Sequence, residues 1–261
     1  MQSSALTRVD KIRGLSHANW IEIGRAQNAA FLRSLEALEP EDWAKPTDCD
    51  RWAVKDIAAH VLGAAEGLTS FSELRRQLGA ARKRKEELGN QLNAMNEVQV
   101  EDRRGLTPAD LIERLRPALD RFIRLRSRIG APGRFIPMYD PSLLGLTTVR
   151  YLLDTIYARD VFMHRIDIAR ATGKRLESLE EDRDLIADVV RDWSHRAKPD
   201  AILGLTGALS RTFSMGEGKT RITADAIGFC RVMSGRAEAK DLRIDGNEQA
   251  AIGWLERGCP F

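Results

Sequence analysis

The stretch from Asp154 to Arg170 (DTIYARDVFMHRIDIAR) constrains the fold most, because polar side chains interrupt an otherwise apolar helical face. On a helix, this face reads Leu153, Ile156, Tyr157, Asp160, His164, Asp167, Ile168 and Ala171. Asp160 and His164 are four residues apart, so their side chains meet on one side of the helix. A carboxylate on a buried face is costly unless a cation or hydrogen-bond donors neutralise it. The stretch therefore predicts a largely buried helix with a polar cluster at its centre.

Two interpretations of this polar cluster remain open from the stretch alone. In the first, Asp160, His164 and Asp167 ligate a metal ion. In the second, they form a buried ion-pair or hydrogen-bond network with an arginine of the same stretch: Arg159, Arg165 or Arg170. An Asp and a His at this spacing are common by chance, so the stretch by itself favours the network.

A second histidine falls in the middle of an apolar helical stripe. The segment Val54–Leu78 predicts a helix, and His60 shares one face with Ile57, Val61, Ala64, Ala65 and Leu68. A lone histidine there is usually a core side chain with a hydrogen-bonded neighbour. Because His164 is the only other histidine within such a stripe, the pair favours a metal site of His60, Asp160 and His164. Two imidazoles and one carboxylate leave coordination positions open for water or substrate.

The helical patterns continue through the first two thirds of the chain. Four helices of about twenty residues are predicted, and they span His17–Leu38, Val54–Leu78, Thr107–Arg128 and a segment from Thr147 or Thr148 to Thr172. They indicate a four-helix bundle over residues 1–175, in which ligand sites are built from side chains on facing helices. We expect residues 1–16 to form a loose arm and residues 134–147 a loop.

Arginines of the third predicted helix are expected to form its solvated face: Arg114, Arg116, Arg121, Arg124, Arg126 and Arg128. After Lys174 the pattern changes to a helix over Glu177–Lys198, followed by short β-like stretches between glycines. The strands are expected over residues 201–205, 209–213, 220–224 and 242–244. This pattern predicts a small α+β domain with an antiparallel sheet over residues 176–261.

Composition excludes several classes of protein. Of the 261 residues, 43% are hydrophobic and 30% charged, which is typical of a globular protein. No apolar run reaches the ~18 residues that a membrane helix needs, and the N-terminus lacks a signal-peptide core, so we expect a cytoplasmic protein. The net charge is only +3 and the basic residues match no nucleic-acid-binding module. The expected partner is a small-molecule substrate, with neither nucleic acid nor membrane, for a monomer or homodimer.

Cysteine usage also limits the chemistry. Three widely separated cysteines (Cys49, Cys230 and Cys259) without a Cys-x-x-Cys pair indicate neither a disulfide framework nor a cysteine-type zinc site. No cysteine lies on a helical stripe beside the three candidate ligands. We expect Cys49, the nearest in sequence, to be a small buried residue and not a nucleophile.

Three segments resemble a known family. Pro46–His60 contains the Cys49–His60 run CDRWAVKDIAAH, which resembles a motif of the mycothiol-dependent maleylpyruvate isomerase family, within the DinB-like superfamily. Asp160–Ala169 (DVFMHRIDIA) resembles that family's second motif, on the fourth helix. Ser234-Gly235-Arg236, followed by Leu242–Gly246, resembles its C-terminal domain, which is similar to sterol-carrier folds. Together these resemblances cover nearly the whole chain.

The resemblance implies a metal- and thiol-dependent enzyme. It implies a divalent ion, zinc being the ion we expect, held by His60, Asp160 and His164, with a low-molecular-weight thiol (mycothiol) as cosubstrate. The position of Asp160 is often Glu or His in relatives, and Asp is one methylene shorter than Glu. Arg236 is expected to neutralise an anionic substrate, and Asp167 to orient a ligand histidine or a metal-bound water.

Three functional hypotheses follow from the sequence. The leading one is an isomerase or thiol S-transferase, in which a metal-bound thiolate attacks a small electrophile. The second is a metal-containing protein that binds a small ligand without turnover. The third is a structural role, with His60, Asp160 and His164 as a buried polar network without an ion.

Overall fold

The computed structural model describes residues 6–140 and 145–261, together with all of their side chains except those of residues 131, 139 and 140. The described chain divides into two compact units. One contains residues 24–177, and the other contains residues 6–23 and 178–261. The first boundary falls inside helix α1 (His17–Glu36), and the second lies two residues beyond the expected limit at residue 175.

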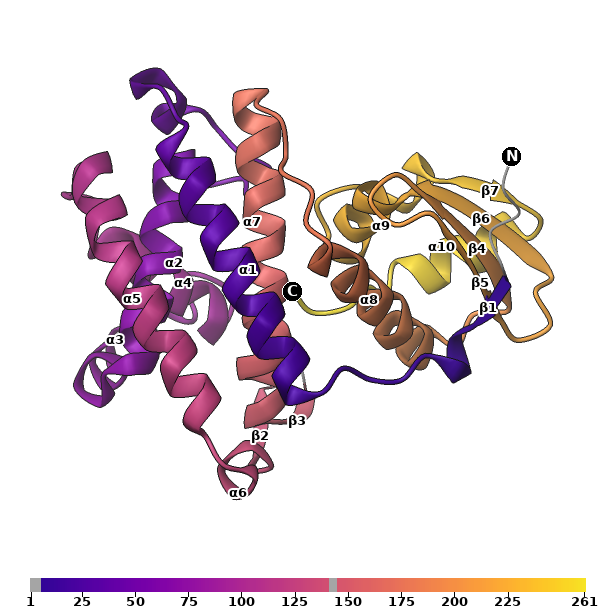
Figure 1. Cartoon of the computed structure of the whole chain (residues 1–261), viewed down its shortest axis with the longest axis horizontal. Helices are drawn as coiled ribbons and strands as arrows, with labels where there is room; N and C mark the ends of the chain where they lie inside the picture. Colours follow the sequence, from indigo (N-terminus) through magenta and orange to yellow (C-terminus); the bar gives the residue numbers. More distant parts are fainter. Residues whose placement is uncertain (1–5, 141–144) are drawn as a thin grey trace. The chain divides into compact units, whose positions relative to one another are not determined.

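The unit of residues 24–177 is mainly helical. Besides α1 it contains α2 (Val54–Thr69), α3 (Phe71–Arg84), α4 (Gln91–Glu101), α5 (Pro108–Arg128), α6 (Ala131–Arg134), the hairpin strands β2 (Pro137–Asp140) and β3 (Gly145–Thr148), the π-helical turn η3 (Tyr151–Ile156) and α7 (Tyr157–Thr172). Figure 1 shows α1, α2, α5 and α7 running alongside one another. Their apolar faces form one core, which includes Phe31, Leu35, Ile57, Leu62, Leu115, Leu119, Val161 and Ile168.

The predicted long second helix is wrong beyond Thr69. Ser70 has an extended backbone (φ −137°, ψ 113°) and its hydroxyl accepts a hydrogen bond from the backbone N–H of Glu73, so a new helix, α3, begins at Phe71. A serine that caps a helix start satisfies an N–H left without a partner inside the helix. The charged residues 79–106 contain the last six residues of α3 and all of α4.

The region before the central helix also differs from the prediction. The expected loop over residues 134–147 contains the hairpin β2–β3, with residues 141–144 outside the described chain. Helical backbone begins at Val149, directly after the expected start at Thr147 or Thr148, and the Thr148 hydroxyl accepts a hydrogen bond from the Tyr151 N–H at 3.2 Å. The unexpected feature is the wider π-helical turn η3, which leads directly into α7. Such turns add a residue to a helix and shift the side chains that follow relative to those before them.

One arginine of α5 is not on the solvated face predicted for it. The side chain of Arg126 is only 2% exposed, lies over the Phe122 ring at 5.5 Å, and has Asp154 Oδ1 at 3.8 Å. Arg126 lies four residues from Phe122, so both side chains project from the same face of α5 into the core. The carboxylate that accompanies it comes from η3, which sequence periodicity did not predict.

The second unit contains a five-stranded sheet of mixed direction. Its strands are β1 (Leu6–Arg8), β4 (Ala201–Thr206), β5 (Arg211–Met215), β6 (Thr220–Asp225) and β7 (Arg243–Asp245). The strand order is β1-β5-β4-β6-β7, in which the β1–β5 and β4–β6 pairs are parallel. The expected antiparallel sheet is therefore wrong for two of the four pairs. Residues 6–8 were expected in a loose arm but form the edge strand β1. Three residues are too few to show the alternation of apolar and polar side chains by which a strand is predicted.

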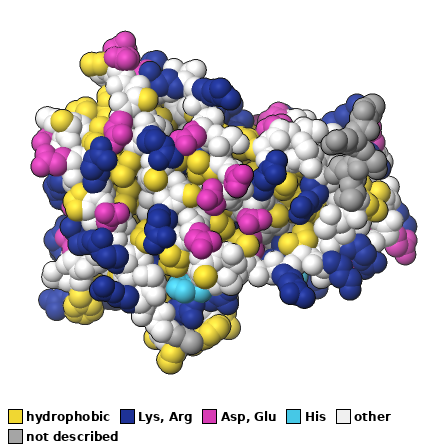
Figure 2. Space-filling view, in the orientation of Figure 1, with side chains coloured by type: hydrophobic (Ala, Val, Ile, Leu, Met, Phe, Trp, Pro, Cys, Tyr) yellow, Lys and Arg dark blue, Asp and Glu magenta, His cyan; other side chains and the backbone are white. Residues whose placement is uncertain are grey.

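Helices α8 (Glu181–Ala197), α9 (Ala226–Met233) and α10 (Glu248–Leu255) accompany this sheet (Figure 1). Trp193 of α8 packs edge-on against Phe229 of α9, with ring centroids 5.4 Å apart, and its indole N–H donates to the carbonyl of Trp254 at 2.8 Å. Among the described residues, no helix is long and apolar enough to cross a membrane. Basic and acidic side chains are interspersed over the face seen in Figure 2.

Candidate metal centre

The helical unit brings together the three side chains predicted to hold a metal. His60 lies on α2, whose first turn is fixed by a hydrogen bond from the backbone N–H of Ala53 to the Asp56 carboxylate (3.0 Å). Asp160 and His164 lie one turn apart on α7, which packs against α2. The imidazoles of His60 and His164 are 6% and 2% exposed, and the Asp160 side chain is 21% exposed.

The donor-atom spacing fits a shared cation better than a direct hydrogen-bond network. His60 Nε2 lies 3.5 Å from Asp160 Oδ2, and His164 Nε2 lies 3.3 Å from Asp160 Oδ1. One donor atom from each residue lies within 4.8 Å of the others. Charge-assisted N–H···O bonds are about 2.7–2.9 Å long. Ligands at ~2.0–2.2 Å from a tetrahedral zinc ion are separated by about 3.3–3.5 Å, so the three residues fit such an ion.

The rival interpretation invoked three nearby arginines, and each has a partner outside the Asp160–His164 pair. Arg159 donates to the Tyr151 hydroxyl at 3.5 Å, and Arg170 Nε donates to Asp48 at 2.8 Å. Arg165 donates to the Gln27 side chain and to the carbonyl of Glu177. These contacts direct the guanidinium groups to other parts of the unit.

Electrostatics at the cluster favours a positive charge between the imidazoles and the carboxylates. Burial opposes ionisation of Asp160, but the nearby His164 and His60 rings outweigh it and hold the pKa of this carboxyl well below its usual range. Burial likewise acts to lower the pKa of His164, but the Asp160 and Asp167 carboxylates outweigh it and raise that pKa well above the ordinary value. A bound cation can take the place of the protons that this site otherwise attracts.

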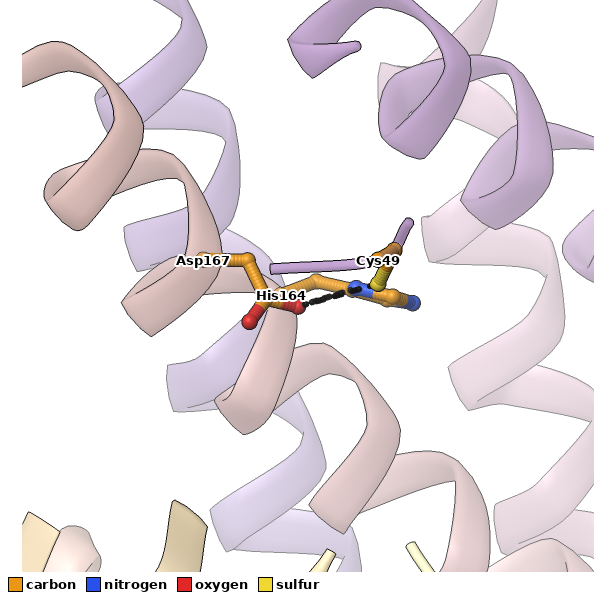
Figure 3. Close-up of side chains that lie close together, drawn as sticks. All are labelled: Cys49, His164 and Asp167. Carbon is orange, nitrogen blue, oxygen red and sulfur yellow. Dashed lines mark hydrogen bonds and ion pairs between the residues drawn. The ribbon is translucent and has the colours of Figure 1, made fainter. Parts of the chain in front are cut away.

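Asp167 lies behind His164 and not among the three converging donors. Its Oδ2 lies 3.0 Å from His164 Nδ1 and accepts a hydrogen bond from the Cys49 thiol at 3.6 Å. Figure 3 shows the sulfur of Cys49 and the carboxylate of Asp167 beside the His164 ring. The ligand atoms of Cys49, His164 and Asp167 also lie close enough together to hold a metal ion. However, the Cys49 thiol and His164 Nδ1 both contact the same oxygen, Asp167 Oδ2, at hydrogen-bonding distances. This second group therefore fits a hydrogen-bonded support for His164.

Two residues of the loop before α2 belong to the site although sequence reasoning assigned them no role there. Cys49 was expected to be a small buried residue, and it is half-buried and contacts Asp167. Trp52 lies beside both imidazoles, with its ring centroid 4.9 Å from that of His60 and 6.1 Å from that of His164. Their presence in the Cys49–His60 run was the only available signal, because a loop has no periodicity from which side-chain direction can be inferred.

Arg236 lies in the other unit, in the turn that ends α9. Gly235 has a positive φ of 75°, and the backbone N–H of Arg236 donates to the carbonyl of Arg231 at 2.8 Å. This hydrogen bond is typical of the Schellman motif at helix ends. In that motif the residue before Arg236, here Gly235, takes a left-handed backbone, which glycine adopts readily. The Gly-Arg pair thus has a structural role through its backbone, while the half-buried Arg236 side chain keeps its predicted role as a hypothesis.

Fold and site together define a class of protein: a helical unit with two histidines and an aspartate converging between two helices, followed by an α+β unit. A model of the mycothiol maleylpyruvate isomerase N-terminal domain matches residues 25–169, and the chain belongs to this family. It therefore belongs to an enzyme family of isomerase type. No curated protein matches the chain.

Two solved structures share the fold along almost the whole chain. One is a mycothiol-dependent maleylpyruvate isomerase, with a TM-score of 0.55, 16% identity, and coverage of 88% of this chain and 92% of that chain. The other is a mutant of a mycothiol-dependent maleylpyruvate isomerase in which a histidine is replaced by alanine. Its TM-score is 0.56 at 16% identity, and the match covers 92% of this chain and 95% of that chain. The fold class predicted from the sequence, helices followed by an α+β unit, is thereby confirmed.

Proposed function

We propose that this protein is a metal-dependent enzyme that uses a low-molecular-weight thiol, mycothiol, to isomerise a small electrophile or transfer the thiol to it. The observation that carries the proposal is the convergence of His60, Asp160 and His164 at metal-ligand spacing. All three lie inside the segment that matches the isomerase family model. Maleylpyruvate is the first substrate to test.

His60 and His164, each through Nε2, and Asp160, through its carboxylate, would hold the divalent ion, and zinc suits this ligand set. When bound, such an ion would lower the pKa of a coordinated thiol, so that a thiolate is available at neutral pH. Because Asp160 is the most exposed of the three side chains, thiol and substrate are expected to reach the open coordination positions past it. The two nearly buried imidazoles then form the enclosed side of the site.

We propose roles for two further charged side chains, Asp167 and Arg236. Asp167, accepting from Nδ1–H of His164, would keep that proton on Nδ1 and leave the Nε2 lone pair free for the ion. Arg236 is proposed to neutralise a substrate carboxylate through a bidentate contact. In this mechanism the nucleophile is the cosubstrate thiol, and Cys49 has a supporting role, because its thiol donates a hydrogen bond to the buried Asp167 carboxylate.

An activity assay separates the enzyme from the binding protein without turnover. We expect zinc-loaded protein to convert maleylpyruvate in the presence of mycothiol, and to lose this activity when either zinc or the thiol is left out. The reaction is followed by the absorbance of the conjugated substrate, and other electrophiles are screened for thiol conjugation. Tight thiol binding without turnover of any of these substrates would instead support the binding protein.

Replacing Asp167 by asparagine tests its orienting role. The Asp167→Asn side chain fits the space but lacks the charge that holds the proton on Nδ1 of His164, so zinc affinity should fall by roughly 10–100-fold. Competition with a chromophoric chelator measures this affinity. Asp120→Asn is the matched control, because the Asp120 side chain on α5 is 76% exposed. Equal zinc affinity in Asp167→Asn and the wild type would rule out the role.

A further inference from the structure

The two imidazoles of the candidate metal centre are supported differently. His164 has a carboxylate partner at Nδ1, which is Asp167 Oδ2 at 3.0 Å. His60 Nδ1 is buried and, among the described residues, has no hydrogen-bond partner. Metal-bound histidines almost always donate their second ring N–H to a carboxylate, carbonyl or water, which fixes the ring orientation. The orientation of the His60 ring therefore needs another source within the protein.

Trp52 is placed to supply that orientation by packing. Its ring lies 4.9 Å from the His60 ring, centroid to centroid, with an interplanar angle of 36°. The same indole lies 6.1 Å from the His164 ring, and the two imidazoles are 5.3 Å apart and nearly perpendicular, at 76°. A single rigid side chain thus lies beside both nitrogen ligands. Aromatic packing of this kind restricts ring rotation without requiring a polar partner.

The loop of residues 46–53 holds Trp52 in this position. Pro46 and Ala53 form an isolated antiparallel bridge that closes the loop. Within it, the backbone N–H and the hydroxyl of Thr47 both donate to the Trp52 carbonyl, at 3.1 and 2.8 Å, and the Trp52 N–H donates to the Cys49 carbonyl at 2.7 Å. The indole therefore projects from a backbone that is fixed on both sides of it.

The same loop reaches the second imidazole through Cys49. The thiol donates to Asp167 Oδ2, the oxygen that also bonds Nδ1 of His164. One short loop thus supports both histidines, Trp52 by contact with His60 and Cys49 through Asp167. These are contacts of two different kinds, and they point to the same function for the loop.

We propose that the loop of residues 46–53 positions the ligands of the metal centre, and that Trp52 is the positioning residue for His60. Its indole takes the place of a hydrogen bond to His60 Nδ1, for which the described part of the chain offers no partner. The inference rests on the proposed metal site, and it adds residues that neither ligate an ion nor touch a substrate in the mechanism above.

The test compares metal binding by Trp52→Ala, Trp52→Phe and wild-type protein. Zinc affinity is measured by chelator competition, and ligand geometry by the visible absorption bands of the cobalt(II)-substituted protein. We expect Trp52→Ala to bind zinc roughly 10–100-fold more weakly, as other losses of ligand support do, with altered cobalt bands. Trp52→Phe keeps a ring against His60 and should retain affinity and bands close to those of the wild type.

Two further variants keep the outcome interpretable. Trp43→Phe changes a tryptophan of the hydrophobic core (6% exposed), and should lower thermal stability without changing zinc affinity or the cobalt bands. Should Trp52→Ala fail to fold, Trp52→Leu fills most of the space without a ring and should weaken binding in the same direction. Wild-type affinity and bands in a folded Trp52→Ala or Trp52→Leu variant would overturn this inference alone. A wild-type protein that binds no zinc would contradict the proposed function as well.

Discussion

Replacing either His60 or His164 by alanine is expected to abolish stoichiometric zinc binding and thiol-dependent turnover together. Each variant removes one of two imidazoles whose Nε2 atoms converge on Asp160 at 3.5 and 3.3 Å. With only two ligands left, zinc affinity should fall by more than the ~10–100-fold that loss of a supporting contact costs. Zinc content is measured by mass spectrometry after dialysis, and activity under saturating mycothiol.

His195→Ala is the matched control for these variants. His195 is exposed on α8, in the other unit, and its Nδ1 contacts the carbonyl of Arg191 within the same helix. This variant should keep both full zinc content and full turnover. Retention of one zinc per chain by both His60→Ala and His164→Ala would exclude the site.

Removing the metal is expected to lower the thermal stability of the protein by roughly 10 °C. A ligand that binds only the folded state stabilises it by about 4 kcal/mol at a thousandfold excess over its dissociation constant. For a unit of this size, each kcal/mol shifts the melting temperature by about 2–4 °C. The measurement is a thermal scan of wild-type protein with zinc and with excess chelator.

The His60→Ala variant serves as the control in the thermal scans, since its melting temperature should not depend on chelator. This comparison separates the loss of a bound ion from other effects of the chelator. An unchanged melting temperature in the wild type would favour the third hypothesis, in which the same side chains form a buried polar network without an ion. In that network the long 3.3–3.5 Å separations would have to be bridged in another way.

Helical periodicity was sufficient to bring the three candidate ligands together in the prediction. His60 and His164 each interrupt an apolar stripe, and such stripes face a core, so two interruptions on different helices predict a shared interior position. The structure has both imidazoles almost buried and close to Asp160. Asp167 lies one turn beyond His164, and its Oδ2 lies 3.0 Å from His164 Nδ1; its predicted role, to orient a ligand histidine or a metal-bound water, stays a prediction.

Features that depend on single residues or on distant pairing were not predictable in the same way. Ser70 separates α2 from α3, because its hydroxyl accepts a hydrogen bond from the Glu73 N–H and caps the start of α3. The strand β1 is defined by its parallel partner β5, about two hundred positions away, and not by its own three residues. Trp52 and Cys49 reach the site because Thr47 and the Pro46–Ala53 bridge fold their loop back. Buried Arg126 depends likewise on the carboxylate of Asp154 in a π-helical turn.

X-ray absorption spectroscopy of the zinc-loaded protein identifies the atoms that surround the ion. We expect one zinc per chain with only nitrogen and oxygen neighbours at about 2.0–2.2 Å, two of them imidazole nitrogens. A sulfur neighbour at ~2.3 Å in the absence of added thiol would instead place the ion on Cys49, with His164 and Asp167, and contradict the assignment. Failure to bind any ion under loading conditions would contradict it altogether.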